Sequence, residues 1–219
     1  MNLKVTRTDS NASTTLFAAA EADALALLRS HVRAIDNSED DLLKIYLDAA
    51  IDYMQELSDR LLGVHDVVVT LDYDEVIHHH GVTIPKCQNI GDSLTIKYRK
   101  KDNSFSEDVT ANQVGSPLAA NPDYLEDFEY IWQKGRYPAL INLRNLPGQL
   151  DETSEFSEDF VELAFTAGTA LASLPKQYKQ AALLLVGHYY NMREAENIGG
   201  ITTEVKEGVH RLIQSVRQF

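Results

Sequence analysis

The sequence predicts an α+β protein, mainly an α-helical bundle of four helices with a small β-rich segment inserted between the second and third helices. Two segments near the start and two near the end repeat apolar residues at three- and four-residue spacing, as amphipathic helices do. Between them, short β-branched runs alternate apolar and polar residues, as half-buried strands do. Strands that are grouped together, and do not alternate with helices, indicate α+β rather than a doubly wound sheet.

The chain of 219 residues is long enough to bury its own core. We expect residues 1–19 to form a flexible, polar N-terminal arm, because they are rich in Thr, Ser and Asn. Residues 20–219 are expected to form one domain, in which residues 64–138 are the β-rich insertion. No apolar run approaches the roughly 18 residues of a membrane span, and the N-terminus lacks the apolar core of a signal peptide.

The first helix is predicted over residues 21–33 and the second over residues 39–62, with Gly63 as its stop. The second helix has a broad apolar stripe, which should pack against neighbouring helices. The members of this stripe are Leu42, Leu43, Ile45, Tyr46, Ala49, Ala50, Tyr53, Met54, Leu57 and Leu61. Acidic residues, among them Asp48, Asp52 and Glu56, occupy its other face. Acids also open this helix, at Glu39, Asp40 and Asp41, where the helix dipole stabilises negative charge.

The middle of the chain has the pattern of short strands. Strands are predicted over residues 67–71, 82–84, 94–98, 139–143 and 161–166. A polar and aromatic stretch lies over residues 112–138, and an acidic loop over residues 150–159. The third long helix is predicted over residues 175–196, because Pro175 is tolerated where a helix begins. Its apolar residues include Tyr178, Ala181, Ala182, Leu184, Leu185, Tyr189 and Met192. A last amphipathic helix is predicted over residues 203–218.

Charge and composition restrict the possible functions. The chain has 33 acidic and 20 basic residues, a formal net charge of −13. This argues against a protein that grips nucleic acid through its phosphates, which requires clustered Lys and Arg. It is compatible with an acidic wall along which DNA slides without binding. The single cysteine, Cys87, cannot form an internal disulfide and is interpreted as a buried, inert thiol.

No catalytic, metal or cofactor site is predicted. His78, His79 and His80 are interpreted as a solvated turn or strand end. On a strand the middle side chain would point away from the other two, whereas zinc needs converging ligands. The basic run around Lys97 and Lys101 is interpreted as a solvated hairpin end. The sequence has no Gly-rich phosphate loop, nucleophile elbow or recognisable Cys/His pair. We therefore expect no enzymatic activity and no cofactor.

Two regions of the sequence resemble the head–tail connector (adaptor) family of tailed bacteriophages. In the first half these are residues 24–33, 40–43 and 49–53, an opening helix, an acidic break and a long second helix. In the second half, residues 161–168 are similar to the strand and turn before the family's third helix. Residues 174–194 are similar to its proline-started helix, which ends in a His-aromatic-x-Asn-x-Arg-Glu signature.

The resemblance implies a structural subunit of the virion neck, made in the host cytoplasm and located at the head–tail interface. Such subunits form a homo-oligomeric ring below the portal, typically a dodecamer in the virion, although an isolated subunit can be monomeric. The ring extends the DNA channel and provides a platform for the next neck or tail protein. Residues expected at subunit or portal contacts are Tyr189, Asn191, Arg193, Glu194, Arg211, Arg217 and Phe219. Asp48, Asp52 and Glu56 are expected to line the channel.

Three other functions remain open on the sequence alone. A tail-completion or stopper protein of the neck would bind a partner ring through the strand-rich middle segment. A helical module associated with DNA packaging would bind duplex DNA in a salt-dependent way, and the net charge of −13 opposes it. An enzyme with a metal site at His78–His80 would contain stoichiometric metal that is lost on His79→Ala.

Overall fold

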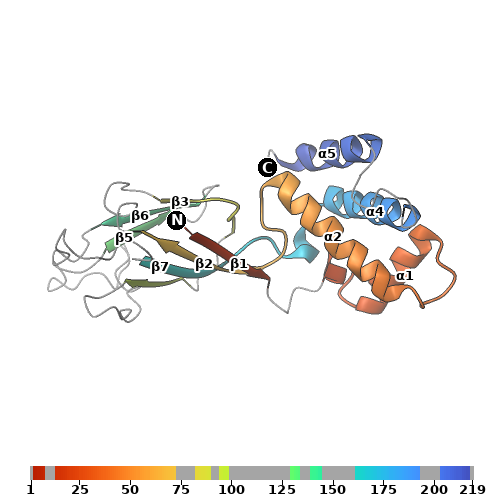
Figure 1. Ribbon diagram of the computed structural model, residues 1–219, viewed down its shortest axis with the longest axis horizontal. Helices are drawn as coiled ribbons and strands as arrows, with labels where there is room; N and C mark the ends of the chain where they lie inside the picture. Colours follow the sequence, from red (N-terminus) through yellow and green to blue (C-terminus); the bar gives the residue numbers. More distant parts are fainter. Residues whose placement is uncertain are drawn as a thin grey trace. The chain divides into compact units, whose positions relative to one another are not determined.

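The structure, a computed structural model, describes residues 2–7, 13–72, 82–89, 94–98, 129–133, 139–144, 161–192 and 203–217. The chain divides into two compact units (Figure 1). One unit is β-rich and contains residues 1–8 and 65–168, while the other is helical and contains residues 9–64 and 169–219. Four α-helices together with antiparallel strands confirm the predicted α+β class.

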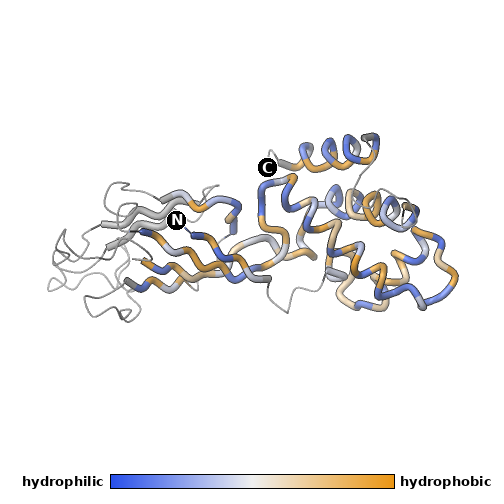
Figure 2. Tube along the Cα trace, in the orientation of Figure 1, coloured by the Kyte–Doolittle hydropathy of each residue, from blue (hydrophilic) through white to orange (hydrophobic). Residues whose placement is uncertain are grey.

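The helical unit contains the four α-helices and two short 3-10 helices. The α-helices are α1 (Glu21–Val32), α2 (Asp40–Ser58), α4 (Lys176–Asn191) and α5 (Thr203–Arg217). The 3-10 helices are η1 (Ser13–Leu16) and η3 (Leu171–Ser173). Helices α2 and α4 pack against each other, and each also packs against α1 and α5, so these two helices form the centre of the unit. Figure 2 shows apolar and polar residues alternating along these helices at helical spacing.

The core of the helical unit is formed by the faces that the helices turn toward one another. Apolar side chains on these faces are fully buried, and they include Leu28, Leu43, Leu47, Met54, Ala181, Leu185, Val209 and Ile213. Burial of such a side chain contributes about 1.5–3 kcal/mol relative to exposure. Four residues predicted within the apolar stripes are exposed instead: Ile45 at 61%, Leu184 and Met192 at 39% each, and Ala49. Ile45 and Ala49 lie on the outer face of α2 and Leu184 on that of α4, which Met192 directly follows.

Helix α2 ends earlier than Gly63, the predicted stop. Asp59 takes a left-handed conformation with φ 56°, and its N–H bonds to the carbonyl groups of the last helical turn. An aspartate tolerates this conformation better than most side chains do. The Gln55 side chain then accepts a hydrogen bond from the Leu62 N–H at 3.1 Å, which holds the connection that follows the helix.

The β-rich unit contains a four-stranded and a three-stranded antiparallel sheet. The first has the order β1-β2-β7-β4, with β1 (Asn2–Arg7), β2 (His65–Leu71), β7 (Val161–Ala167) and β4 (Thr95–Tyr98). The second has the order β3-β6-β5, with β3 (Val82–Ile84), β6 (Ala139–Arg144) and β5 (Glu129–Gln133). Buried and partly exposed residues alternate along β7, as its sequence predicts.

The N-terminal residues differ from the expected flexible arm. Asn2–Arg7 form β1, which pairs with β2 so that Leu3 lies opposite Val69 and Val5 opposite Val67. Ser13–Leu16 form η1, in which Leu16 is fully buried. β1 was not predicted, because its six residues give only a short alternation of polar and apolar residues and its partner strand lies about sixty residues later in the chain. β5 likewise falls within the stretch over residues 112–138, for which no strand was predicted.

Candidate functional site

The acidic residues of α2 form one exposed stripe. Asp48, Asp52 and Glu56 follow one another at four-residue spacing, so they share a face of the helix, and all three are exposed. The opposite face of α2 is buried in the core. Asp48 accepts a hydrogen bond from the Ser13 hydroxyl of η1, so this carboxylate also fixes the segment before α1. The stripe is a continuous negative surface, as the sequence predicts.

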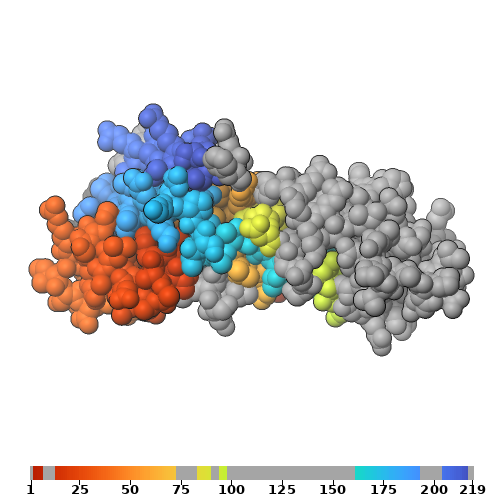
Figure 3. All heavy atoms as spheres, turned by 180° about the vertical axis from the view of Figure 1, so that it is seen from behind, coloured from red at the N-terminus to blue at the C-terminus, as the bar shows by residue number. Residues whose placement is uncertain are grey.

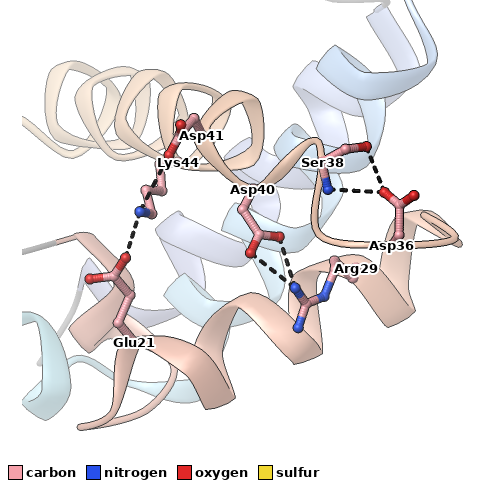
Figure 4. Close-up of polar contacts among 7 residues, drawn as sticks. All are labelled: Glu21, Arg29, Asp36, Ser38, Asp40, Asp41 and Lys44. Carbon is pink, nitrogen blue, oxygen red and sulfur yellow. Dashed lines mark hydrogen bonds and ion pairs between the residues drawn. The ribbon is translucent and has the colours of Figure 1, made fainter.

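The acids that begin α2 are engaged within the molecule (Figure 4). Arg29 Nη1 donates to both carboxylate oxygens of Asp40, at 3.0 and 2.9 Å. Lys44 Nζ lies 2.5 Å from Glu21 and 3.5 Å from Asp41, and the hydrogen bond to Glu21 raises the Lys44 pKa above its ordinary value. These contacts hold α1 against α2, so the acid cluster has a structural role.

The loop between α1 and α2 is also held by local polar contacts. Asp36 accepts hydrogen bonds from the Ser38 N–H at 2.9 Å and from the Ser38 hydroxyl at 2.5 Å. These bonds to the charged form hold the pKa of Asp36 below its ordinary value. Such a turn, in which a side chain bonds the backbone two residues later, fixes the approach to the second helix.

The end of α4 contains the first of the predicted interface residues. Tyr189 is half-buried against Tyr46 of α2, with ring centroids 6.1 Å apart, and burial raises the pKa of the Tyr189 hydroxyl. The next tyrosine, Tyr190, donates a hydrogen bond to Glu39 at the start of α2, at 2.5 Å. Asn191, the last residue of α4, is exposed, as is Met192 after it. The sequence did not reveal that the two tyrosines join α4 to α2.

Of the remaining predicted interface residues, Arg211 and Arg217 belong to α5. Arg211 lies on the outer face of α5, where its side chain is 82% exposed and 3.7 Å from Glu207, one turn earlier. Arg217 is the last residue of α5. Arg193, Glu194 and Phe219 lie outside the described residues.

Helices α1 and α4 meet at a close contact that the sequence did not indicate. His31 Nε2 lies 2.9 Å from the Leu183 carbonyl oxygen, and the ring lies beside Gly187. A side-chain carbon added at Gly187 would lie 3.1 Å from His31 Nε2, so glycine leaves the room that this histidine occupies.

No cluster of three or more potential metal ligands occurs among the described residues. The histidines His78–His80 and the acidic loop over residues 150–159 lie outside them. Cys87 is a free, fully buried cysteine, as predicted, and burial raises the pKa of its thiol to about 12. That the thiol is inert stays a prediction. In the part of the chain that the structure describes, no helix is long and apolar enough to cross a membrane.

The chain was compared with known families and structures. Residues 23–114 match the family described as phage gp6-like head-tail connector protein. A chain from the neck of an empty gene transfer agent (GTA) particle, computed with C6 symmetry, is 20% identical and has a TM-score of 0.61, covering 97% of this chain and 95% of that chain. A chain from the neck of a native GTA particle, computed with C12 symmetry, is 19% identical with a TM-score of 0.60, covering 98% and 94%. No curated protein sequence matches the chain.

These comparisons agree with the fold described above. The structural likeness, at this level of identity, shows the fold, and it extends over nearly the whole of both chains. A connector is a structural part of a virus particle, so the family match supports a protein without enzymatic activity. Residues 23–114, somewhat less than half of the chain, are therefore similar to the phage gp6-like head–tail connector proteins, and the chain has the fold found in GTA neck proteins.

Proposed function

We propose that the protein is a structural subunit of the virion neck, which assembles below the portal as a homo-oligomeric ring and extends the DNA channel toward the tail. The observation that carries this proposal is the family match over residues 23–114, together with a fold likeness that covers 97% of the chain. The similar chains come from neck particles computed with six-fold and twelve-fold symmetry, which supports a ring of copies. A closed ring needs two different surfaces that meet head to tail.

Within this ring, the acidic stripe of α2 is proposed to face the DNA. Asp48, Asp52 and Glu56 would repel the phosphates of a passing duplex, so that DNA moves without being held. Contacts to the portal or to a neighbouring subunit are proposed at Asn191 and Arg211, and at Arg193, Glu194, Arg217 and Phe219. Tyr189 is proposed to contribute to these contacts indirectly, because it holds the end of α4 against α2.

The β-rich unit is proposed to be an insertion with a separate docking role. Residues 65–168 lie between the two sequence segments that form most of the helical unit, so they can vary without interrupting the helical core. A platform for the next neck or tail protein is the role that suits this unit in a connector.

The main test is the mass of the protein by light scattering, alone and after mixing with the cognate portal. We expect either a large ring or a monomer that joins the portal in stoichiometric amounts. A monomer or small dimer that ignores the portal contradicts the proposal. That result would favour a stopper or tail-completion protein that binds a different partner ring.

The channel assignment has its own test. Lysine substitutions at Asp52 and Glu56 together should leave the fold intact, because both side chains are exposed, whereas Asp48 is kept because it holds Ser13. We expect the double variant to join the portal and to retard duplex DNA in a gel-shift assay at low salt, whereas the wild type does not. Matched substitutions at Glu204 and Glu207, on the outer face of α5, are the control. Equal behaviour of the two variants would overturn the channel assignment.

A further inference from the structure

β1 is the edge strand of its sheet and, among the strands that the structure describes, pairs with β2 alone (Figure 1). Of its side chains that the structure describes, only Leu3 is partly buried, and the other four are exposed. Even Val5, which lies opposite the fully buried Val67, is 36% exposed. β1 therefore adds few apolar contacts to the core and is held mainly by its backbone hydrogen bonds to β2.

β2, in contrast, is held from several sides. Four of its seven side chains are buried, those of His65, Val67, Val69 and Leu71. On its other edge, all seven residues of β2 pair with β7, so we expect the strand to keep its extended shape without β1. The edge of β2 that β1 covers is therefore a preformed site for one strand, as the edges of sheets are in general.

The chain that follows β1 is anchored in the other unit. β1 belongs to the β-rich unit, whereas η1 belongs to the helical unit. Leu16 of η1 is fully buried, and the Ser13 hydroxyl donates a hydrogen bond to Asp48 of α2. η1 also packs against α1, which adjoins α4 at the surface (Figure 3). The strand and its anchor thus belong to different units of the chain.

A short tether joins β1 to this anchor. From Arg7 to Ser13 the chain makes six steps between consecutive residues, which span at most about 20 Å when fully extended. Any β2 edge within this distance of η1 is accessible to β1, whether it belongs to the same copy of the chain or to an adjacent copy. The tether therefore limits the choice of β2 edge to a subunit and its direct neighbours.

We propose that β1 is an exchangeable strand, which pairs with β2 of its own chain in the free subunit and with β2 of the neighbouring copy in the ring. The same strand occupies the edge in both states, so the register that places Leu3 opposite Val69 is kept. No second complementary surface is needed, because each copy already contains both the strand and its site. The inference rests on the proposed ring and specifies one connection between its copies.

The burial of the strands explains why β1 is the element that exchanges. Detaching β1 exposes little apolar surface, whereas β4, at the opposite edge of the sheet, contains the fully buried Ile96. Local opening of a segment with few buried contacts requires little free energy. Pairing with the neighbouring β2 restores the same backbone hydrogen bonds, and exchange of an identical element is a low-cost route to association.

The test is a pair of cysteines placed directly opposite each other on the two strands. Lys4 lies opposite Val68, and neither side chain is buried, so the double variant Lys4→Cys, Val68→Cys should fold. Facing residues of antiparallel strands are close enough for a disulfide to form on oxidation. The natural Cys87 is fully buried, with a thiol pKa of about 12, so it should not react. The variant is oxidised free and on the cognate portal, then separated on denaturing gels without reductant.

The free and the assembled protein should give different products. The free subunit should form a disulfide within one chain and migrate as a monomer, whereas the portal-bound protein should give a ladder of covalently linked chains. Portal-bound protein that contains only the internal disulfide would overturn the exchange and leave the proposed function standing. Portal-bound protein in which neither cysteine is oxidised would mean that a strand of another protein has displaced β1, and would also overturn the exchange. A wild-type chain that neither forms a ring nor joins the portal would overturn both proposals.

Single variants are the control for which strands pair. Lys4→Cys and Val68→Cys chains, mixed and assembled on the portal, should give dimers without a ladder, and each variant alone should give no linked chains. Dimers from Lys4→Cys alone would show that two β1 strands pair with each other, and would overturn the exchange. A second pair, Thr6→Cys with Asp66→Cys, also lies directly opposite on the two strands and is exposed. It should reproduce the ladder, so a folding defect of the first pair does not leave the question open.

Discussion

The inner and outer faces of α2 and α4 have similar apolar residues in sequence but opposite surroundings in the structure. Leu47 and Leu185 are fully buried between the helices, whereas Ile45 and Leu184 are substantially exposed. The comparison shows that an aliphatic residue can belong to a broad apolar stripe of a helix and still be exposed. The inner residues maintain the fold, and the outer residues are available for contact with another molecule.

The largest expected effect separates two adjacent leucines of α4. Leu185→Asp should prevent the helical unit from folding, because it creates an unpaired charge in a fully buried site. Leu184→Asp, one residue earlier and exposed, should change the free energy of unfolding by less than about 1 kcal/mol. Circular dichroism and thermal melts of both variants give the measurement. Equal destabilisation by the two would mean that the face assignment of α4 is incorrect.

An intermediate effect is expected at the contact between α1 and α2. Arg29→Ala removes the paired hydrogen bonds to Asp40, whose side chain, like that of Arg29, is about three-quarters covered. We expect a loss of about 1–2 kcal/mol in the free energy of unfolding, because Asp40 keeps its charge without its partner. Lys44→Ala, which removes a more exposed contact to Glu21, is the matched control and should cost less. Denaturant titrations at low salt measure both, and the opposite order would show that the exposed pair matters more.

The elements with strong periodicity could be predicted from the sequence. The start of α1, the span of β2 and the position of α5 follow from regular apolar spacing, because such spacing reflects burial on one face. β1 could not be predicted, because its residues are ordered by pairing with a distant strand. The acidic stripe of α2 was likewise visible as a helical pattern.

The parts of the site that depend on tertiary contacts could not be predicted. Tyr190 reaches Glu39 across about 150 residues of sequence, and His31 reaches Leu183 over a similar separation. Neither contact can be recognised from the residues that surround its partners in the sequence. Ile45 and Leu184 could not be told from the buried members of their stripes, because the width of an apolar stripe does not determine which of its edges remains exposed.

The smallest effect on stability at neutral pH is expected at Cys87. This residue allows the contrast between buried and exposed side chains to be tested in the β-rich unit. Its pKa is raised from 9.0 to about 12 because burial disfavours the thiolate. The unfolded chain therefore loses this proton at lower pH than the folded protein does. Stability contributed by the protonated thiol is fully present below pH 9 and is lost as the pH rises from about 9 toward 12.

Two measurements check the prediction for Cys87. A thiol reagent at pH 8 should modify the folded protein far more slowly than the protein unfolded in denaturant, because the reactive species is the thiolate. In Cys87→Ala, stability should fall less steeply between pH 9 and 11 than in the wild type, because the pH-dependent contribution of the thiol is gone and only the loss of packing, which does not depend on pH, remains. Rapid modification of the folded wild type would show that Cys87 is accessible, and the inner–outer contrast would then apply only to the helical unit.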